Sequence, residues 1–411
     1  MRNVVDILTT PGYVSLIEGP PGIGKTYLAL KACSEKDKCT YISYADPESS
    51  LREKMKFVAP DYKGKLNVVS AMSGSVETVY SEILNALSEG QLVVVDTLDA
   101  MFFGLKDESA VRPFLQLLYG SVKGKSSSMI LIAEGLSPAA EHIKFVSDAI
   151  ISLSFENVLG QNVRALRILK DRDHPVEWPL RYITVIDQFR ILDPSFMLSK
   201  PVIGKLSKIT TPQSADVQSV EYLGNRVLIE MDMVVEDVRS SLLKKMLMAD
   251  YLRMGYKVNY LIGPNESRDI FFKDLTELTD KIEKLNIISY SAKDSGYKAE
   301  NIKFPASVEE RNAVNFINLL AEEDFAIKDP IEYEIFVREE VKKDLELNRI
   351  TYIMGHTGQE AMKIQLKYAN IVRKITVTDG FLFWRSIRPL GFVYYVDINP
   401  ENGSVEFMRV G

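Results

Sequence analysis

One stretch decides the fold expected for the N-terminal half of the chain, Gly19-Pro20-Pro21-Gly22-Ile23-Gly24-Lys25-Thr26. It fits the pattern G-x-x-x-x-G-K-[ST], with the apolar run VSLIE before it and the helix-like run TYLALKAC overlapping its end. Glycines at these positions let backbone N–H groups turn inward onto a phosphate, and the N-terminus of the following helix adds positive partial charge. The stretch therefore predicts a phosphate-binding loop between a strand and a helix.

The side chains at the end of this loop have distinct expected roles. Lys25 is expected to bridge the β- and γ-phosphates of ATP, and the Thr26 hydroxyl to ligate Mg²⁺. Tyr27 is the last residue of the predicted nucleotide contact. ATP and Mg²⁺ are thus the expected cofactors, and the alternative interpretation is a glycine-rich turn that binds no ligand.

A second candidate metal ligand ends the apolar run Leu92-Val93-Val94-Val95-Asp96. A buried strand that carries one carboxylate at its C-terminal end can hold the Mg²⁺ shell. Any buried strand can end in Asp, so the prediction depends on the loop that precedes it in the chain. Asp99 is expected to cap the following helix rather than to act in catalysis.

Outward from these motifs, short apolar runs alternate with helix-like stretches. The runs are Tyr13–Ile17, Thr40–Tyr44, Leu92–Val95 and Met129–Ala133. Such near-continuous hydrophobic strands separated by helices predict a parallel sheet covered on both faces. Closely spaced strands within residues 149–186 predict an antiparallel edge. We assign residues 1–195 to this domain and residues 196–220 to a connecting region.

Residues 221–411 resemble a degenerate repeat of the first domain. YISYADPES (41–49) matches YLIGPNES (260–267), and KFVSDAIISLSF (144–155) matches KYANIVRKITVT (367–378), in the same order along the chain. The loop Asp232–Asp237 has no glycine or lysine and carries three carboxylates, which would repel a triphosphate. We place the counterpart of Asp96 near Lys328 and expect His356 to be structural rather than catalytic.

Composition excludes several classes of protein. The net charge is −6, and no block of five or more like charges occurs, which disfavours autonomous binding to nucleic acid. Cys33 and Cys39 are the two cysteines, so we expect no disulfide framework, a reducing compartment, and burial rather than metal binding. There is no signal-peptide core and no apolar stretch of about 18 residues. The expected location is cytoplasmic, with no membrane span.

The order of the motifs resembles the RecA superfamily, in particular the KaiC-like branch that includes the gas-vesicle regulator GvpD. Four stretches carry the resemblance, EGPPGIGKT, CTYISYADPES, LVVVDTLDA and FVSDAIISLSFENVLGQNVRALRILKDRDHP. It covers residues 10–195 well and the rest loosely. The implied fold class is α/β, a RecA-like P-loop domain with a mainly parallel sheet followed by a second α/β domain interpreted as a degenerate RecA-like repeat.

The resemblance also implies catalytic residues. In this branch a lysine and an arginine in an L-K-x-R strand reach the nucleotide of a neighbouring protomer, and Lys170 and Arg172 hold the matching positions. Relatives with strong hydrolysis carry a Glu pair after the second strand, where a carboxylate orients the attacking water. This chain has Asp46, one methylene shorter, and Glu48 beyond a proline. ATP hydrolysis is therefore expected to be slow.

Three functions compete on this evidence. The first is an ATP-dependent regulatory or assembly switch that forms a homo-oligomer or binds a protein partner, as the resemblance to GvpD-like and KaiC-like proteins implies. The alternative is a DNA-repair or recombination accessory ATPase that binds single-stranded DNA, against which the acidic charge counts. The third is a small-molecule kinase, which needs an arginine-rich lid, whereas Leu105–Arg112 offers one arginine.

Overall fold

The computed structural model describes residues 2–71, 76–103, 111–123, 126–134, 143–194, 226–232, 238–289, 294–302, 308, 310–398 and 405–411. Packing divides the chain into two compact units. The N-terminal unit consists mainly of Met1–Asn157 and Asn162–Asp193, and the C-terminal unit mainly of Pro194–Arg409. The connecting region 196–220 lies outside the described residues, so the predicted domain limits stay predictions.

The N-terminal unit is built on a nine-stranded sheet with the order β3-β2-β4-β5-β1-β6-β7-β8-β9. Parallel pairs join β1 to β5 and β6, and β2 to β3 and β4, whereas β7, β8 and β9 pair antiparallel, as the sequence predicts. The strands are β1 (Val14–Glu18), β2 (Lys38–Ser43), β3 (Lys65–Ser70), β4 (Leu92–Asp96), β5 (Ser128–Ala133), β6 (Ala149–Val158), β7 (Gln161–Asp171), β8 (Leu180–Thr184) and β9 (Arg190–Leu192).

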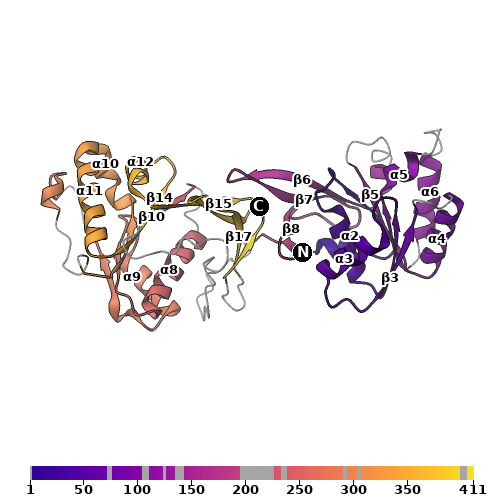
Figure 1. Ribbon diagram of the computed structural model, residues 1–411, viewed down its shortest axis with the longest axis horizontal. Coiled ribbons are helices and arrows are strands. Elements are labelled where there is room, and N and C mark those ends of the chain that lie inside the picture. The colour runs from indigo at the N-terminus through magenta and orange to yellow at the C-terminus, as the bar shows by residue number, and fades with distance from the viewer. Residues whose placement is uncertain are drawn as a thin grey trace. The chain divides into compact units, whose positions relative to one another are not determined.

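Helices cover both faces of this sheet (Figure 1). One core contains apolar residues of α1 (Val4–Leu8), α2 (Lys25–Ser34) and α3 (Glu48–Val58), and the other those of α4 (Val76–Ser88), α5 (Leu98–Phe103) and α6 (Val111–Val122). Strands β1, β4 and β5 are buried at every position because both of their faces are covered. The edge strand β3 is partly exposed, so it lacks the continuous apolar run that marks the others, and the sequence analysis missed it.

The C-terminal unit has a second nine-stranded sheet, with the order β12-β11-β13-β14-β10-β15-β16-β17-β18. Its strands are β10 (Arg226–Met231), β11 (Val258–Leu261), β12 (Leu285–Ile288), β13 (Val314–Asn318), β14 (Ile350–His356), β15 (Ile371–Thr378), β16 (Phe381–Arg388), β17 (Val393–Ile398) and β18 (Val405–Arg409). The α-helices are α8 (Val238–Arg253), α9 (Arg268–Leu278), α10 (Leu320–Lys328), α11 (Pro330–Glu346) and α12 (Glu360–Tyr368), and two short 3₁₀ turns are η4 (Ile282–Lys284) and η5 (Ala299–Asn301).

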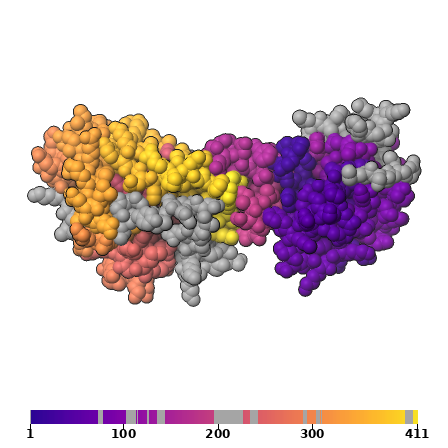
Figure 2. Space-filling view, in the orientation of Figure 1, coloured from indigo at the N-terminus to yellow at the C-terminus, as the bar shows by residue number. Residues whose placement is uncertain are grey.

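The two sheets have the same strand order. When β10 is set on β1, β11 on β2 and so on to β18 on β9, every neighbour matches. The α-helices of the C-terminal unit also divide between two cores, with α8 and α9 in one and α10, α11 and α12 in the other. In the space-filling view, the orange atoms of α10 and α11 form part of this unit's outer surface (Figure 2). The predicted fold class, two α/β domains with mainly parallel sheets, is confirmed.

Among the described residues, no helix has both the length and the apolar character needed to cross a bilayer.

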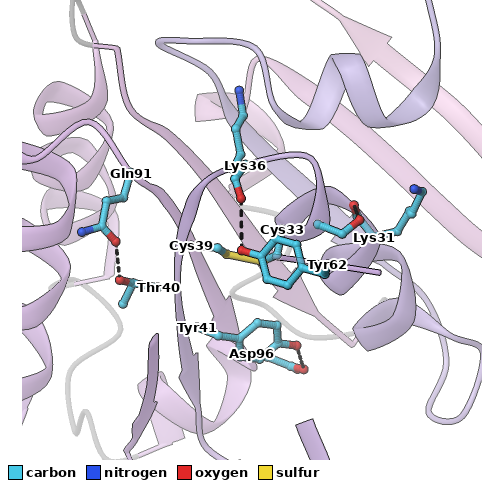
Figure 3. Close-up of a disulfide and its surroundings, with 10 residues drawn as sticks. Lys31, Cys33, Lys36, Cys39, Thr40, Tyr41, Tyr62, Gln91 and Asp96 are labelled. Atoms are coloured by element: carbon cyan, nitrogen blue, oxygen red, sulfur yellow. Dashed lines mark hydrogen bonds between the residues drawn. A yellow bond between two sulfur atoms is a disulfide. The ribbon is translucent and has the colours of Figure 1, made fainter. Parts of the chain in front are cut away.

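The two cysteines correct a prediction. Cys33 at the end of α2 and Cys39 in β2 are joined in a disulfide, with their Cα atoms 5.4 Å apart and both side chains buried (Figure 3). The sequence predicts no disulfide framework and a reducing compartment from two cysteines, and this pairing corrects the first of these expectations. The turn between α2 and β2 reverses the chain and brings the two residues to bonding distance, a local geometry that cysteine counting does not reveal.

Candidate functional site

The loop Gly19–Gly24 leaves β1 at the carboxyl edge of the sheet and enters α2 at Lys25. Gly19 has φ +152°, and a Cβ atom there would lie 2.6 Å from the carbonyl oxygen of Leu153. Gly24, the N-cap of α2, has φ +115°. Neither conformation suits an L side chain, so the sequence pattern reflects real backbone requirements. The loop and the first turn of α2 form the anion-binding arrangement that the sequence predicts.

The Lys25 side chain folds back over this loop. Its Nζ donates to the carbonyl oxygens of Gly19 at 2.7 Å and Pro20 at 3.0 Å. Burial lowers the pKa of Lys25, while the nearby carboxylates of Glu134 and Asp96 act in the opposite direction. The ammonium therefore lies within the loop, where it can turn from the carbonyls to a phosphate.

Thr26 and Asp96, the two predicted metal ligands, are in contact. The Thr26 Oγ1 donates to Asp96 Oδ2 at 3.0 Å, and the Tyr41 hydroxyl donates to the same oxygen at 2.6 Å (Figure 3). Burial raises the pKa of Asp96, and the two hydrogen bonds partly oppose that effect. A hydroxyl and a carboxylate at the start of α2 are hard oxygen ligands of the type that Mg²⁺ prefers.

Tyr41 is a site residue that the sequence analysis missed. It lies within β2, is fully buried, and orients the Asp96 carboxylate from the neighbouring strand. Burial, followed by the charge of Asp96, raises its pKa well above the ordinary value for tyrosine, so the hydroxyl stays a donor. A tyrosine inside an apolar run predicts a core residue, and only the register of β2 against β4 shows its second role.

The two candidate water-orienting carboxylates lie in different environments. Asp46 follows β2, and its charge contributes to the raised pKa of both Asp96 and Tyr41, so it lies near the metal-ligand pair. Glu48, in the first turn of α3, is half exposed and pairs with Arg52 at 2.6 Å. The structure therefore brings Asp46, and not Glu48, toward Asp96.

Lys170 and Arg172 lie at the opposite, amino edge of the same sheet. The Arg172 N–H donates to the Asp148 carbonyl, and Asp148 Oδ2 accepts from the N–H of Val14, the first residue of β1. The phosphate-binding loop follows the other end of β1, about 16 Å away at about 3.3 Å per residue. Lys170 Nζ donates to the Lys144 carbonyl at 3.3 Å, and the Arg172 guanidinium pairs with Asp148 at 2.9 Å.

The remaining predicted contacts are placed around the loop. Pro20 and Pro21 are exposed, and Ile23 is buried in the core with α2. The Tyr27 ring, on the first turn of α2, stacks on Phe189 and meets Phe57 edge to face, so aromatic packing holds it beside the loop. Asp99 Oδ2 accepts from the N–H of Glu134 at 2.7 Å and so links α5 to the end of β5.

The corresponding edge of the C-terminal unit holds different chemistry. Asn318 ends β13 in the place where Asp96 ends β4, which corrects the prediction that this position falls near Lys328. Lys328 instead ends α10, the helix that follows β13, so the prediction placed the counterpart one element too far along the chain. Tyr260 of β11 is the counterpart of Tyr41 of β2. It pairs with Phe316 of β13, just as Tyr41 pairs with Val94 of β4.

An internal ion pair occupies this edge of the C-terminal unit. The Lys244 ammonium pairs with Glu266 and donates to the Tyr260 hydroxyl at 2.7 Å. The same Glu266 accepts from Asn318 Nδ2 at 2.8 Å, and Lys244 holds the pKa of Glu266 below its usual range. Of the acidic loop 232–237, only Asp232 is among the described residues, and it accepts from the Thr376 hydroxyl. His356 ends β14, largely buried.

These features define the N-terminal unit as a P-loop nucleotide-binding domain of the RecA superfamily. Residues 9–191 match the model of the KaiC ATPase family. The chain is also similar to the circadian clock oscillator protein KaiC of Synechococcus elongatus, with 22% identity over 231 residues. That alignment covers 50% of this chain and 44% of the cyanobacterial protein, so the chain spans less than half of this relative. The N-terminal unit is a KaiC-like P-loop ATPase domain.

Proposed function

We propose that this protein binds ATP with Mg²⁺ at Gly19–Thr26, hydrolyses it slowly, and uses the nucleotide state to control its association with other copies or with a protein partner. The observation that carries the proposal is the convergence of Thr26 and Tyr41 on the Asp96 carboxylate, directly at the phosphate-binding loop. A structural carboxylate in a core is not expected beside a lysine that folds over a glycine-rich loop.

The residues divide the binding task among them. Backbone N–H groups of the loop and of the first turn of α2 face the phosphates, and Lys25 exchanges its two carbonyl acceptors for phosphate oxygens. Bound Mg²⁺ neutralises phosphate charge and orients the γ-phosphoryl group. Thr26 and Asp96 are the ligands this chain offers to it, and Tyr41 fixes the orientation of the carboxylate.

Hydrolysis requires two further groups, of which one lies near the site and the other does not. Asp46 lies near enough to Asp96 for its charge to act on that carboxylate, so we assign it the orientation of a water molecule, although its side chain is shorter than that of Glu. Arg172 is at the amino edge, so it cannot reach the loop of its own unit. A cation that stabilises the transferring phosphoryl group is worth about 10³-fold or more in rate. Under our proposal, a second copy supplies Arg172, with Lys170, to the loop.

The test is ATP turnover measured against protein concentration. Specific activity is expected to rise through the concentration range in which the protein associates, and to fall about 10³-fold in Arg172→Ala while ATP affinity is kept. The substitution is structurally mild because Asp148 retains Lys123 at 2.8 Å and the Val14 N–H. Brisk turnover that is independent of concentration and of Arg172 would show that the site is complete within one chain.

Arg167 provides the matched control for this experiment. It lies on β7, the strand that Arg172 directly follows, is exposed to a similar extent, and pairs with Glu156 at 2.7 Å. Arg167→Ala is expected to leave turnover and its concentration dependence unchanged. An equal loss in both variants would indicate that losing any arginine on β7 or directly after it disturbs the sheet edge, and would argue against a role for Arg172 in another copy's site.

A further inference from the structure

The candidate water-orienting carboxylate Asp46 is held by a contact that the function described above does not use. Its Oδ2 accepts from the Lys54 ammonium at 2.6 Å, and the two side chains are 30% and 26% exposed. Lys54 lies in the second turn of α3, eight positions along the chain from Asp46. Nothing in the phosphate-binding pattern requires a lysine there.

The backbone of Asp46 is fixed as well. The Ser43 hydroxyl accepts from the Asp46 N–H at 3.0 Å and donates to the Asp46 carbonyl at 2.7 Å. Ser43 itself pairs with Asp96 in the register of β2 against β4. The Asp46 backbone is therefore tied to the end of β2 beside Asp96, and its carboxylate can move by rotation of the side chain.

Contacts with α3 limit the rotation of the Asp46 carboxylate. One carboxylate oxygen is bound to Lys54, and the other lies 3.5 Å from the Ser50 hydroxyl, also on α3. A carboxylate that orients the attacking water must present an oxygen toward the nucleotide, at hydrogen-bond distance from that water. To do so, Asp46 has to give up part of its contact with Lys54.

We propose that Lys54 is a positioning residue that restrains Asp46 on α3 and so keeps ATP hydrolysis slow. This inference rests on the proposed ATPase function and adds a second restraint to the requirement for Arg172. The pair is partly buried, and ion pairs of modest burial contribute up to about 1 kcal/mol. Release of Asp46 is therefore expected to raise kcat up to about five-fold.

The experiment compares steady-state ATP turnover of the full chain, at saturating protein concentration, for the wild type and five variants. Lys54→Met is expected to raise kcat up to about five-fold with KM unchanged, because Lys54 pairs with Asp46 on α3 and is not one of the residues assigned to hold the nucleotide. Lys54→Arg keeps the ion pair and is expected to restore the wild-type rate. Lys56→Met, an exposed lysine on the same helix, is expected to have no effect.

The last two variants, Asp46→Asn and Asp46→Asn/Lys54→Met, separate this inference from the proposed function. Asp46→Asn/Lys54→Met is expected to be as slow as Asp46→Asn alone, because the restraint acts only through the carboxylate. A wild type that hydrolyses ATP together with a Lys54→Met variant that is equal or slower would overturn the restraint and leave the ATPase intact. If neither protein turns over ATP that it binds, both hydrolysis and the restraint are wrong, while nucleotide binding stands.

Discussion

The two units of this chain share one strand order and differ at one edge of the sheet. In the N-terminal unit that edge carries Lys25, Thr26 and Asp96, which are arranged around a glycine-rich loop. In the C-terminal unit it carries an ion pair between Lys244 and Glu266, closed by Asn318. Buried apolar strands therefore specify the fold, while a few residues beyond the strand ends specify the chemistry. The same fold persists after that chemistry is lost.

The opposite, amino ends of the strands carry a buried carboxylate with two cations in both units, but only in the C-terminal unit are the cations buried as well. In the C-terminal unit, Arg226 and Arg349 are both fully buried and converge on Asp344. The Asp344 carboxylate also accepts from the Thr351 hydroxyl at 2.8 Å. Hydrophobic packing alone does not account for this arrangement, so the C-terminal unit depends on buried charges that must remain paired.

The largest effect is expected from breaking that buried cluster. Asp344→Ala leaves two buried guanidinium groups without their shared carboxylate and should lower the free energy of unfolding of the C-terminal unit by about 3–5 kcal/mol. Chemical denaturation followed by fluorescence of Trp384, in a Trp178→Phe background, measures this unit alone, since the chain has two tryptophans. ATP affinity should not change.

Glu346→Ala serves as the control for this prediction, because Glu346 is an exposed acid near the end of the same helix, α11. Its effect should stay within about 0.5 kcal/mol. Equal, small losses in both variants would mean that the Arg226–Asp344–Arg349 cluster contributes no more than a surface charge.

The next largest effect is expected on ATP binding, and its measurement compares Lys25 of the N-terminal unit with Lys244 of the C-terminal unit. Lys25→Ala removes a direct phosphate contact and should weaken ATP binding by about 1.5–3 kcal/mol, the range for hydrogen bonds to charged groups. Lys244→Ala should leave ATP affinity unchanged. Titration calorimetry of the wild type and both variants measures this, and Lys31→Ala, a surface lysine of α2 paired with Glu35, is the control on the same helix. Unchanged affinity in a folded Lys25→Ala variant would refute the assigned site.

Asp96 gives a prediction in which two properties change in opposite directions. Asp96→Asn should weaken the Mg²⁺-dependent part of ATP affinity by about 10- to 100-fold. Because burial raises the pKa of Asp96 in the folded protein, the charged form is disfavoured by folding, and the nucleotide-free variant should be more stable than the wild type at neutral pH. Thermal unfolding with and without Mg²⁺-ATP tests both signs.

The pH dependence follows from the same shift. Only the deprotonated carboxylate binds Mg²⁺, and a raised pKa means that Asp96 takes up its proton at higher pH than an ordinary Asp with a pKa of 3.8. Mg²⁺-dependent ATP affinity should thus fall, by up to about tenfold per pH unit, on acidification through that raised pKa. Affinity that stays constant down to the ordinary Asp range would show that the carboxylate is not a ligand.

The last prediction is that the C-terminal unit has no second nucleotide site, so no additional binding should be measured. The Lys244–Glu266 pair occupies the edge where the C-terminal unit would bind phosphate, so calorimetry should give one ATP per chain. A stoichiometry of two would contradict the interpretation of this unit as degenerate.

A separate measurement tests the alternative function. Salt-dependent retention of the protein on single-stranded DNA would favour the repair-accessory function over the switch.

Much of the fold and of the candidate site could be predicted from the sequence, because the phosphate-binding pattern and the run ending in Asp96 are each formed by consecutive residues. Features that depend on register or on chain reversal could not. Tyr41 is a site residue only because β2 lies beside β4, and Lys54 reaches Asp46 across the turn into α3. The counterpart of Asp96 was misplaced, because Asn318 ends a strand without a carboxylate and only the pairing of β13 between β11 and β14 identifies it.

The placement of the loop and of Arg172 at opposite edges of one sheet has a consequence for symmetry. A two-fold dimer would have to make this contact twice, with each loop on the amino edge of the other copy, whereas an association that makes it once per pair joins two different surfaces and is heterologous. Each added copy completes the site of its neighbour and presents an incomplete one of its own. Such an arrangement either closes into a ring, in which all sites are complete, or leaves one incomplete site at the end of an open chain.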